Sequence, residues 1–246
     1  MRVLVTGAAG AIGRPVCATL VARGHQVRAF DRVPTPEVED ARVGAIEDAD
    51  AVNSACSGVD ALVHLAAITD DAPFTLLVPP NVLGLFHVLD AARVHRLKRV
   101  VLASSVQVVS AGAPGLRTGE QSSPRNHYAL TKLWAERMGE MYARAYSMSI
   151  VAARIGWMVR NPAEAARICE RGYFHSYVSR RDVADFVALA LEASELDFAV
   201  LYAVGPDGRD VFDLDAPRRL IGYEPKDAWP SGLPFPFEVP TAPGKG

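Results

Sequence analysis

The stretch that decides the fold lies at the start of the chain and reads Val3-Leu4-Val5-Thr6-Gly7-Ala8-Ala9-Gly10-Ala11-Ile12-Gly13. A short apolar run, typical of a buried strand, leads directly into three glycines, and a helical pattern follows. Gly7 permits a tight turn, Gly10 lets backbone N–H groups approach a pyrophosphate, and Gly13 allows close packing of helix on strand. Because the N-terminus of a helix attracts anions, the segment predicts a dinucleotide-binding turn.

The end of the second predicted strand indicates which dinucleotide is bound. Asp31 follows Phe30 there, eighteen residues beyond Gly13, where a carboxylate can accept both hydroxyls of the adenosine ribose. The same carboxylate would repel a 2'-phosphate, so NAD is favoured over NADP. Arg32 comes next and could instead receive that phosphate, and Asp31 could also be a simple acid at the entry to a loop.

The chain from Val3 to Asp185 alternates short β-branched runs with longer helical patterns, which is typical of parallel βαβ units. The predicted strands are Arg2–Thr6, Gln26–Phe30, Ala61–Ala66, Arg99–Ala103 and Ser149–Arg154, and the predicted helices are about Ile12–Arg23, Asp48–Ser57, Phe74–His95, Tyr128–Tyr146 and Asp182–Glu192. Right-handed crossovers then give an α/β, Rossmann-type, doubly wound parallel sheet with ligands outside the carboxyl ends of its strands. The stretches Ala111–Asn126 and Val159–Tyr177 are candidate substrate-side loops.

Composition narrows the class of protein. The 246 residues are half hydrophobic and carry a formal net charge of -2, which suits one domain with a buried sheet and gives no basic stripe for nucleic acid. We see no apolar run of the roughly 18 residues that a membrane span requires, and no signal peptide. Three scattered cysteines show no metal-binding or redox spacing, so we expect reduced thiols, no metal and a cytoplasmic location.

We expect a single domain in two functional parts. Residues 1–155 mainly carry dinucleotide binding and catalysis, whereas residues 156–246 mainly supply substrate-side loops and a C-terminal arm. The five prolines of Asp227–Gly246 rule out a helix or central strand there, so the arm should be extended. Trp229 and its neighbouring phenylalanines suggest that its first half docks on this subunit or on a partner, and a frayed tail is the alternative.

A tyrosine and a lysine four residues apart indicate the chemistry. Tyr128 and Lys132 fall on one face of a predicted helix. A free tyrosine ionises near pH ~10 and is a poor base, but a neighbouring ammonium group favours the phenolate. Ser105 lies at the carboxyl end of an earlier strand, where its hydroxyl could bind a substrate oxygen, and Ser104 is the competing choice.

The chain resembles the extended short-chain dehydrogenases/reductases of the NAD-dependent epimerase/dehydratase family. The resemblance rests on residues 6–13, Asp31, His64-Leu65-Ala66-Ala67, Asn81-Val82-Leu83-Gly84, Ala103-Ser104-Ser105 and Tyr128–Lys132. It implies Ser105, Tyr128 and Lys132 as catalytic residues. The cofactor contacts that we expect are Gly7, Gly10, Ala11, Ile12, Gly13, Asp31, Arg32, Ile46, Leu65, Ala66, Ala67, Asn81, Tyr128, Lys132 and Ile155. Asn81 is expected to support Lys132 through water.

A narrower resemblance is to the uronate dehydrogenases, which oxidise C1 of hexuronic acids with NAD to give lactones. It rests on His64–Thr69 running into Pro73-Phe74, on Asn81–Leu85, on Arg154-Ile155-Gly156 and on Gly222–Asp227. It implies substrate contacts from Thr69, Ser105, Val106, Gln107, Tyr128, Trp157 and an arginine of the loop after Gly156. Arg167 is the preferred arginine, and Arg160 and Arg171 are alternatives.

One departure from that family concerns the substrate. Uronate dehydrogenases have Asn-His after the catalytic serine, whereas this chain has Val106-Gln107. Sugar dehydratases have Asp-Glu there for acid/base elimination, and neither Val106 nor Gln107 ionises. We therefore expect hydride transfer between NAD and a sugar or sugar-acid carbinol, with an NAD-retaining sugar epimerase as the alternative. Related enzymes also imply a homodimer formed through the long helices that contain Phe86 and Trp134.

Overall fold

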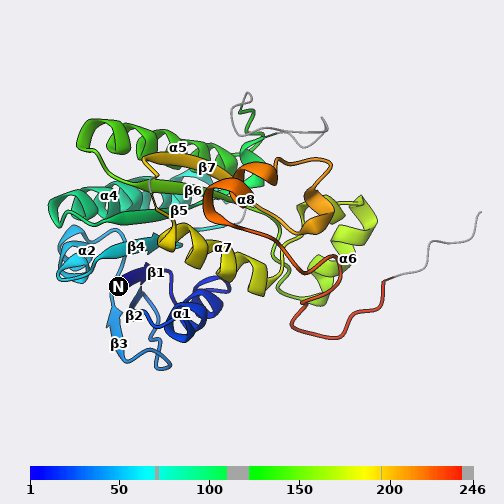
Figure 1. The fold of residues 1–246 in the computed structure, drawn as a ribbon, viewed down its shortest axis with the longest axis horizontal. Coiled ribbons are helices and arrows are strands. Elements are labelled where there is room, and N and C mark those ends of the chain that lie inside the picture. Colours follow the sequence, from blue (N-terminus) through cyan, green and yellow to red (C-terminus); the bar gives the residue numbers. More distant parts are fainter. Residues whose placement is uncertain (70–71, 110–121, 195, 240–246) are drawn as a thin grey trace, which may run out of the picture.

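The protein is built on a parallel β-sheet. The computed structural model describes residues 1–69, 72–109, 122–194 and 196–239. Its strands are β1 (Arg2–Thr6), β2 (Gln26–Asp31), β3 (Asp40–Val43), β4 (Ala61–His64), β5 (Arg99–Ser105), β6 (Ile150–Ile155) and β7 (Phe198–Ala203). Within the described residues they pair in the order β3-β2-β1-β4-β5-β6-β7, all parallel (Figure 1). The predicted Rossmann-type, doubly wound sheet is therefore confirmed.

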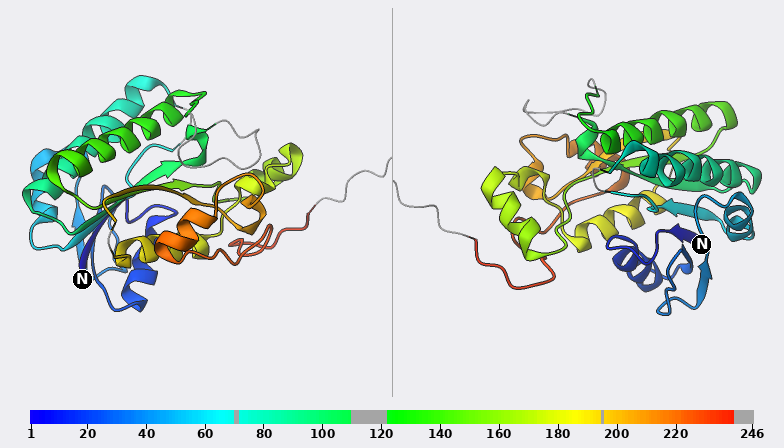
Figure 2. Two further views of the ribbon diagram at one scale, coloured as in Figure 1. Left: turned by 45° about the horizontal axis from the view of Figure 1, so that its top comes forward. Right: turned by 180° about the vertical axis from the view of Figure 1, so that it is seen from behind.

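Helices cover both faces of the sheet (Figure 2). They are α1 (Gly13–Ala22), α2 (Ala49–Cys56), α3 (Phe74–Val78), α4 (Leu85–Val94), α5 (His127–Tyr146), α6 (Pro162–Arg171), α7 (Arg180–Glu192) and α8 (Asp215–Ile221). Helices α1, α7 and α8 pack on one face, and α2, α4 and α5 pack on the other. Helix α6 lies beyond the carboxyl ends of the strands, where the fold predicts that ligands bind (Figure 1).

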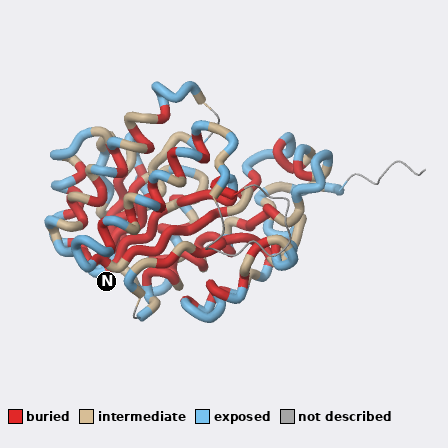
Figure 3. The backbone as a smooth tube through the Cα atoms, turned by 90° about the horizontal axis from the view of Figure 1, so that it is seen from above, coloured by how far each residue is buried: buried red, intermediate tan, exposed pale blue. Residues whose placement is uncertain are grey.

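The two hydrophobic cores follow from the two-residue period of the strands. Val3 and Val5 point into the core beneath α1 and α7, and Leu4 between them points into the core beneath α2 and α4. Neighbouring β4 divides Val63 and Leu62 in the same way. Figure 3 shows the central strands buried throughout and the helices buried on their inner faces. A strand buried on both sides needs a nearly continuous apolar run, as the sequence of β1 shows.

A buried ion pair joins α5 to the middle of the sheet. Glu136 of α5 accepts hydrogen bonds from Arg154 Nε (2.8 Å) and Nη2 (2.9 Å), and from the hydroxyl of Ser104 (2.6 Å). Arg154 also donates to the hydroxyl of Tyr202 on β7 at 3.0 Å. Glu136 and Arg154 are 4% and 2% exposed, so this network is closed to water and fixes α5 against β5, β6 and β7.

The prediction of a loop over Val159–Tyr177 was wrong for its central part, where α6 forms. The helix has ordinary start and stop signals: Asn161 caps it by accepting from Glu164 N, Pro162 stands in the first turn, and Gly172 ends it with φ of 65°. Strands β3 and β7 and helix α8 were also missed. Most of the predicted loop Ala111–Asn126 lies outside the described residues.

The predicted helix over Phe74–His95 is present with an interruption. Pro79 and Pro80 cannot complete the α-helical hydrogen-bond pattern, and a π-helical segment, Pro79–Gly84, separates α3 from α4. The stretch Phe74–Val94 is long and apolar enough to cross a membrane by length and composition alone, and 44% of its apolar window is buried inside the fold. Its buried side chains, among them Val88 and Leu89, pack in the core beside the sheet.

The first part of the C-terminal arm docks on its own subunit. The Trp229 ring lies edge-on to Tyr177, with centroids 5.1 Å apart, and beside Phe174 and Phe237. The Tyr177 hydroxyl donates to Ser231 O at 2.6 Å. The arm therefore braces the segment that carries α6, and of the two docking alternatives the same-subunit one is realised; residues 240–246 lie outside the described part of the chain.

Replacing Glu136 by Gln should strongly destabilise the fold, because Arg154 would keep its buried charge without a counter-charge. We expect Glu136→Gln to lower the free energy of unfolding in urea by about 3 kcal/mol. Glu140→Gln is the matched control, since Glu140 lies one turn along the same helix and pairs with the exposed Arg137 and Arg144. That control should change stability by less than about 1 kcal/mol, and equal effects of the two variants would contradict our account of the buried pair.

Candidate functional site

The glycine turn after β1 is shaped so that no side chain fits in it. Gly7 has φ of 72°, a conformation that L side chains rarely adopt. A Cβ atom added at Gly13 would lie 2.1 Å from Gly7 O, and one at Gly10 would lie 3.1 Å from the same atom. The turn therefore brings β1 and the start of α1 closer together than any other residue would permit, and leaves a backbone cradle of the kind that receives a pyrophosphate.

Asp31 lies at the end of β2 and is tied to this turn. Its Oδ2 accepts from Ala9 N at 2.9 Å, and its Oδ1 accepts from Val33 N at 3.1 Å. Each carboxylate oxygen retains a further lone pair, so the group can still accept from two ribose hydroxyls. The side chain is partly exposed and Arg32 beside it is exposed. The glycine cradle and this carboxylate together fit an NAD molecule.

One cavity of about 900 Å³ connects this cradle to the ends of β5 and β6. The expected cofactor contacts that line it are Gly7, Gly10, Ala11, Ile12, Gly13, Asp31, Arg32, Ile46, Leu65, Ala66, Ala67, Tyr128, Lys132 and Ile155. The expected substrate contacts that line it are Thr69, Ser105, Val106, Gln107, Tyr128, Trp157 and Arg167. The structure thus brings almost all of the predicted site residues together around one cavity.

Asn81 is the expected contact that does not line the cavity. Its Oδ1 accepts from Ile68 N at 2.9 Å, and its Nδ2 donates to Ile68 O (3.0 Å) and Thr131 Oγ1 (3.1 Å). The side chain therefore holds the strand-end loop that precedes α3 against α5, next to Lys132. The water-mediated support of Lys132 by Asn81 stays a prediction.

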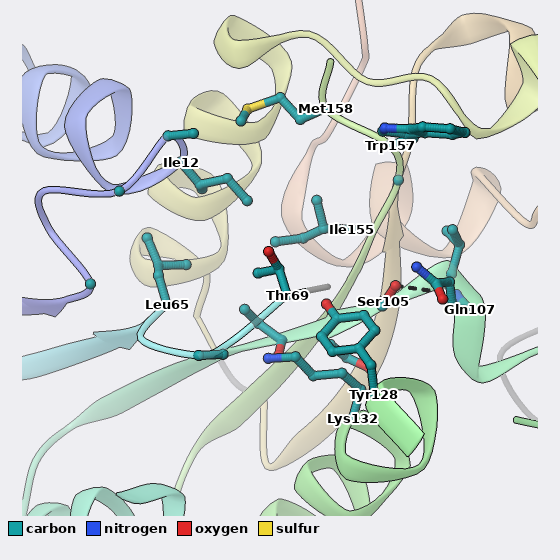
Figure 4. A pocket seen from close by; sticks show the side chains of 18 of the residues that line it. Ile12, Leu65, Thr69, Ser105, Gln107, Tyr128, Lys132, Ile155, Trp157 and Met158 are labelled. Atoms are coloured by element: carbon teal, nitrogen blue, oxygen red, sulfur yellow. Dashed lines mark hydrogen bonds between the residues drawn. The ribbon is translucent and has the colours of Figure 1, made fainter. Parts of the chain in front are cut away.

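Ser105, Tyr128 and Lys132 meet at one end of the cavity, as Figure 4 shows. Ser105 stands at the last position of β5, and its Oγ accepts from Gln107 N at 3.2 Å. Its O–H therefore remains free to donate into the cavity. Tyr128 and Lys132 lie one turn apart on α5, and Lys132 Nζ is 5.7 Å from the centre of the Tyr128 ring.

The geometry separates Ser105 from the competing Ser104. Neighbouring residues of a strand point to opposite faces, and the Ser104 hydroxyl donates to the buried Glu136 carboxylate. The proton of Ser104 is therefore committed to the internal network. Of the two serines, Ser105 is therefore the one whose O–H remains available to the cavity.

Burial shapes the electrostatics of the catalytic end. Lys132 is 6% exposed and donates from Nζ to Ala103 O at 2.9 Å. Loss of water around the ammonium group lowers the pKa of Lys132 to about 8. Burial, together with the charge of Lys132, lowers the pKa of the nearby His64 to about 3, so this histidine is neutral and hydrogen-bonds Thr6 Oγ1 at 2.9 Å. Lys132 is the cation that faces the Tyr128 ring.

Arginines of α6 and its entry line the far side of the cavity. Arg160 is neutralised by Glu164, whose Oε1 lies 2.6 Å from Arg160 Nη2. Arg167 and Arg171 follow at helical spacing, line the cavity, and have no ion-pair partner among the described residues. The arrangement leaves positive charge available at the end of the cavity away from Asp31.

Several cavity residues were not selected from the sequence. They include Arg125, Asn126, Met158, Glu164, Tyr173 and His175. Asn126 carried a signal, since an asparagine directly before a helical pattern predicts an N-cap. Glu164, Tyr173 and His175 reach the cavity because α6 and the segment after it fold over the strand ends, which no local pattern indicates.

Comparisons with known proteins agree with this geometry. The model of the NAD dependent epimerase/dehydratase family matches residues 3–159. A uronate dehydrogenase of Pseudomonas syringae is 31% identical over 234 residues, covering 92% of this chain and 82% of the relative. An NAD-dependent glucose-6-phosphate dehydrogenase of Haloferax volcanii is 27% identical, with 96% of each chain covered. A crystal structure of a tyrosine-to-alanine mutant of Agrobacterium tumefaciens uronate dehydrogenase complexed with NAD superposes with a TM-score of 0.79 at 26% identity, covering 92% of this chain and 84% of that one.

The glycine cradle, the parallel sheet and the cluster of Ser105, Tyr128 and Lys132 at β5 and α5 are the features of a short-chain dehydrogenase/reductase that takes NAD. The chain belongs to the NAD-dependent epimerase/dehydratase family. Within that family it is an NAD-dependent dehydrogenase. The predictions of the fold, the cofactor and the class of enzyme are therefore confirmed.

Replacing Lys132 by Met should stabilise the cofactor-free protein at neutral pH. The pKa of Lys132 is about 8 in the folded protein, whereas that of an ordinary lysine is 10.5. Below about pH 8, folding must therefore bury the charged ammonium group. Lys132→Met removes this cost of burying the charge, which is at most roughly 3 kcal/mol of the free energy of unfolding at pH 7. Between these two pKa values, the folded wild type binds fewer protons than the unfolded wild type. Its free energy of unfolding should therefore rise with pH in that range, relative to that of the variant.

Denaturant unfolding of both proteins at pH 7 and pH 10 measures this difference. Lys98→Met is the control, because the Lys98 side chain is 73% exposed and its removal should leave stability almost unchanged at either pH. A Lys132→Met protein that is less stable than the wild type at pH 7, with the same pH dependence, would contradict the desolvation argument.

Proposed function

We propose that the protein oxidises the anomeric carbon of a hexuronic acid or a closely related aldose to the lactone, with NAD as the oxidant. The observation that carries this proposal is that Ser105, Tyr128 and Lys132 converge on one end of the cavity whose other end holds the glycine cradle and Asp31. A carbinol placed against the two hydroxyls would lie between the proton acceptor and the nicotinamide end of the site.

Tyr128 is the proton acceptor in this scheme. Its phenolate would take the proton of the substrate hydroxyl as the C–H bond breaks, and the Lys132 ammonium group makes that phenolate less costly to form. Ser105 would donate a hydrogen bond to the reacting oxygen, because the bond from Gln107 N uses one lone pair of its Oγ and leaves the O–H free. Lys132 is itself held by Ala103 O, which fixes its position relative to Tyr128.

The residues that would hold NAD divide between the two ends of the cavity. The glycine turn would bind the pyrophosphate, Asp31 the adenosine ribose, and Lys132 the nicotinamide ribose. Bound NAD supplies the acceptor for the hydride that leaves the carbinol carbon. The backbone at Ile155 closes the nicotinamide end.

The chemistry of the remaining lining supports a sugar or sugar acid. The relatives named above act, by their names, on uronates and on glucose 6-phosphate, and both are hydroxylated and anionic. Val106 and Gln107 supply no ionising group next to Ser105, so the site has no acid/base pair there for dehydration. Thr69 and Trp157 complete the walls around the reacting centre (Figure 4).

Arg167 is our choice for the substrate carboxylate. An arginine fork suits a carboxylate, and Arg160 is already neutralised by Glu164. Arg167 lines the cavity at the next turn of α6 and is free of an ion-pair partner within the described part of the chain. It can therefore pair with a substrate anion without first breaking an internal contact.

We also propose that the protein is a cytoplasmic homodimer. Phe86 of α4 and Trp134 of α5 are 45% and 49% exposed, which leaves large apolar side chains on this pair of helices uncovered. Packing of this face on its equivalent in a second copy would bury them. The three cysteines are free thiols, in keeping with a reducing compartment. A monomer in sedimentation at working concentration would remove the dimer proposal.

A substrate screen tests the proposed reaction. Galacturonate, glucuronate and neutral aldoses are each mixed with the protein and NAD, and NADH formation is followed together with the sugar product. We expect NADH to accumulate in step with lactone, most efficiently with a uronate. Formation of an epimer without net NADH would overturn the dehydrogenase proposal, because an epimerase returns the hydride to its substrate.

The same screen tests Arg167. Arg167→Gln should lower kcat/KM for uronates by about tenfold, corresponding to the loss of one charge-assisted hydrogen-bonded contact, and should leave neutral aldoses nearly unaffected. Arg144→Gln is the control, because Arg144 is an exposed arginine of α5 that pairs with Glu140 and does not line the cavity. An equal loss with charged and neutral sugars would show that Arg167 does not read the carboxylate.

A further inference from the structure

Two carboxamides link the catalytic strand end to the start of α5. The Oδ1 atom of Asn126 accepts from Ala129 N at 2.7 Å and so caps the helix that carries Tyr128. The Nδ2 atom of Asn126 donates to Gln107 Oε1 at 2.9 Å. Both residues line the cavity, and Gln107 follows Ser105 by two positions. Neither link is needed for the catalytic scheme described above.

The polarity of this chain of contacts is fixed at one end. A backbone N–H only donates, so the atom of Asn126 that meets Ala129 N must be the amide oxygen. The other atom of the Asn126 amide is then nitrogen, which also only donates, and it must meet the oxygen of Gln107. The remaining amide atom of Gln107 is therefore nitrogen. While the exposed hydrogen bond between Asn126 and Gln107 is intact, the orientation of this amide follows from the helix cap.

The free end of Gln107 is turned to the reacting centre. In Figure 4 the side chain of Gln107 lies beside Ser105, and its amide end faces the space that Ser105, Tyr128 and Trp157 enclose. The Gln107 backbone N–H is already donated to Ser105 Oγ, which holds the residue in place. The cavity thus receives two donors side by side, the Ser105 hydroxyl and the Gln107 amide nitrogen.

We propose that Asn126 is a specificity-determining positioning residue, which sets Gln107 to donate its Nε2 hydrogens to an acceptor oxygen of the substrate, such as a ring or carboxylate oxygen. The inference rests on the proposed function for the presence of a sugar-like substrate. The orientation of the amide, however, is a property of the free protein. A site with this polarity favours an acceptor next to the reacting carbon, and rejects a donor-only group there.

The variant Asn126→Asp reverses the polarity with little change in shape. Aspartate caps helices as well as asparagine does, so Ala129 N keeps its partner and the melting temperature should stay the same. The second carboxylate oxygen can only accept, so Gln107 must turn its nitrogen to Asp and its oxygen to the cavity. We expect KM for the best substrate of the screen to rise about tenfold, while kcat and the Kd for NAD change less than about twofold.

The new negative charge could weaken binding of an anionic substrate by itself, and a double-mutant cycle separates the two effects. In a Gln107→Ala background, Asn126→Asp should change KM by less than about twofold, because no amide remains to be turned. An equal rise of KM in both backgrounds would overturn the proposal and assign the effect to charge alone.

The orientation is also measured without substrate. The side-chain amide resonances of Gln107, identified by their loss in Gln107→Ala, are followed by NMR in the wild type and in Asn126→Asp. We expect a downfield shift in the variant, where the Gln107 NH2 group donates to a carboxylate. Unchanged Gln107 resonances would overturn the proposed orientation even if no sugar in the screen is oxidised, whereas a failed screen with the expected shift would overturn only the proposed function.

Discussion

The buried ion pair between Glu136 and Arg154 is the contact on which the geometry of the site depends. It joins α5 to β6, and its extensions to Ser104 and Tyr202 reach β5 and β7. Tyr128 and Lys132 stand on α5, whereas Ser105 ends β5, so the three side chains keep their distances only while the helix stays docked. Taking two charges out of water is costly, but once both are buried neither can be removed alone.

The shape of the cofactor end of the cavity depends on glycines, which have no side chains. Gly7 and Gly13 bring β1, its turn and α1 together at distances that a Cβ atom would not permit, and Asp31 ties the end of β2 to the same turn. These contacts are made by backbone and by one carboxylate, and they precede any ligand. The cofactor end and the catalytic end are thus built by different means on one rigid sheet, and their separation is set by strand order.

The sequence was sufficient for the fold class and the glycine turn, and it selected Ser105, Tyr128 and Lys132, which the fold brings to one cavity, because each has a local pattern with a physical cause. It was not sufficient for β3, a four-residue edge strand that is mostly exposed, or for the elements near the chain end. Helix α6 was missed although Asn161 and Gly172 mark its ends. The link from Asn126 to Gln107 spans nineteen positions and depends on how α5 meets β5, so no local pattern indicates it.

The central claim is that Tyr128 takes the substrate proton while Ser105 and Lys132 hold the oxygen and the phenolate. Turnover of Tyr128→Phe with the best substrate of the screen tests it directly. Tyr142→Phe is the control, because Tyr142 is a buried tyrosine of the same helix, away from the cavity. The account predicts that kcat falls at least about a hundredfold in Tyr128→Phe with NAD binding retained. A kcat within about twofold of the control would contradict it.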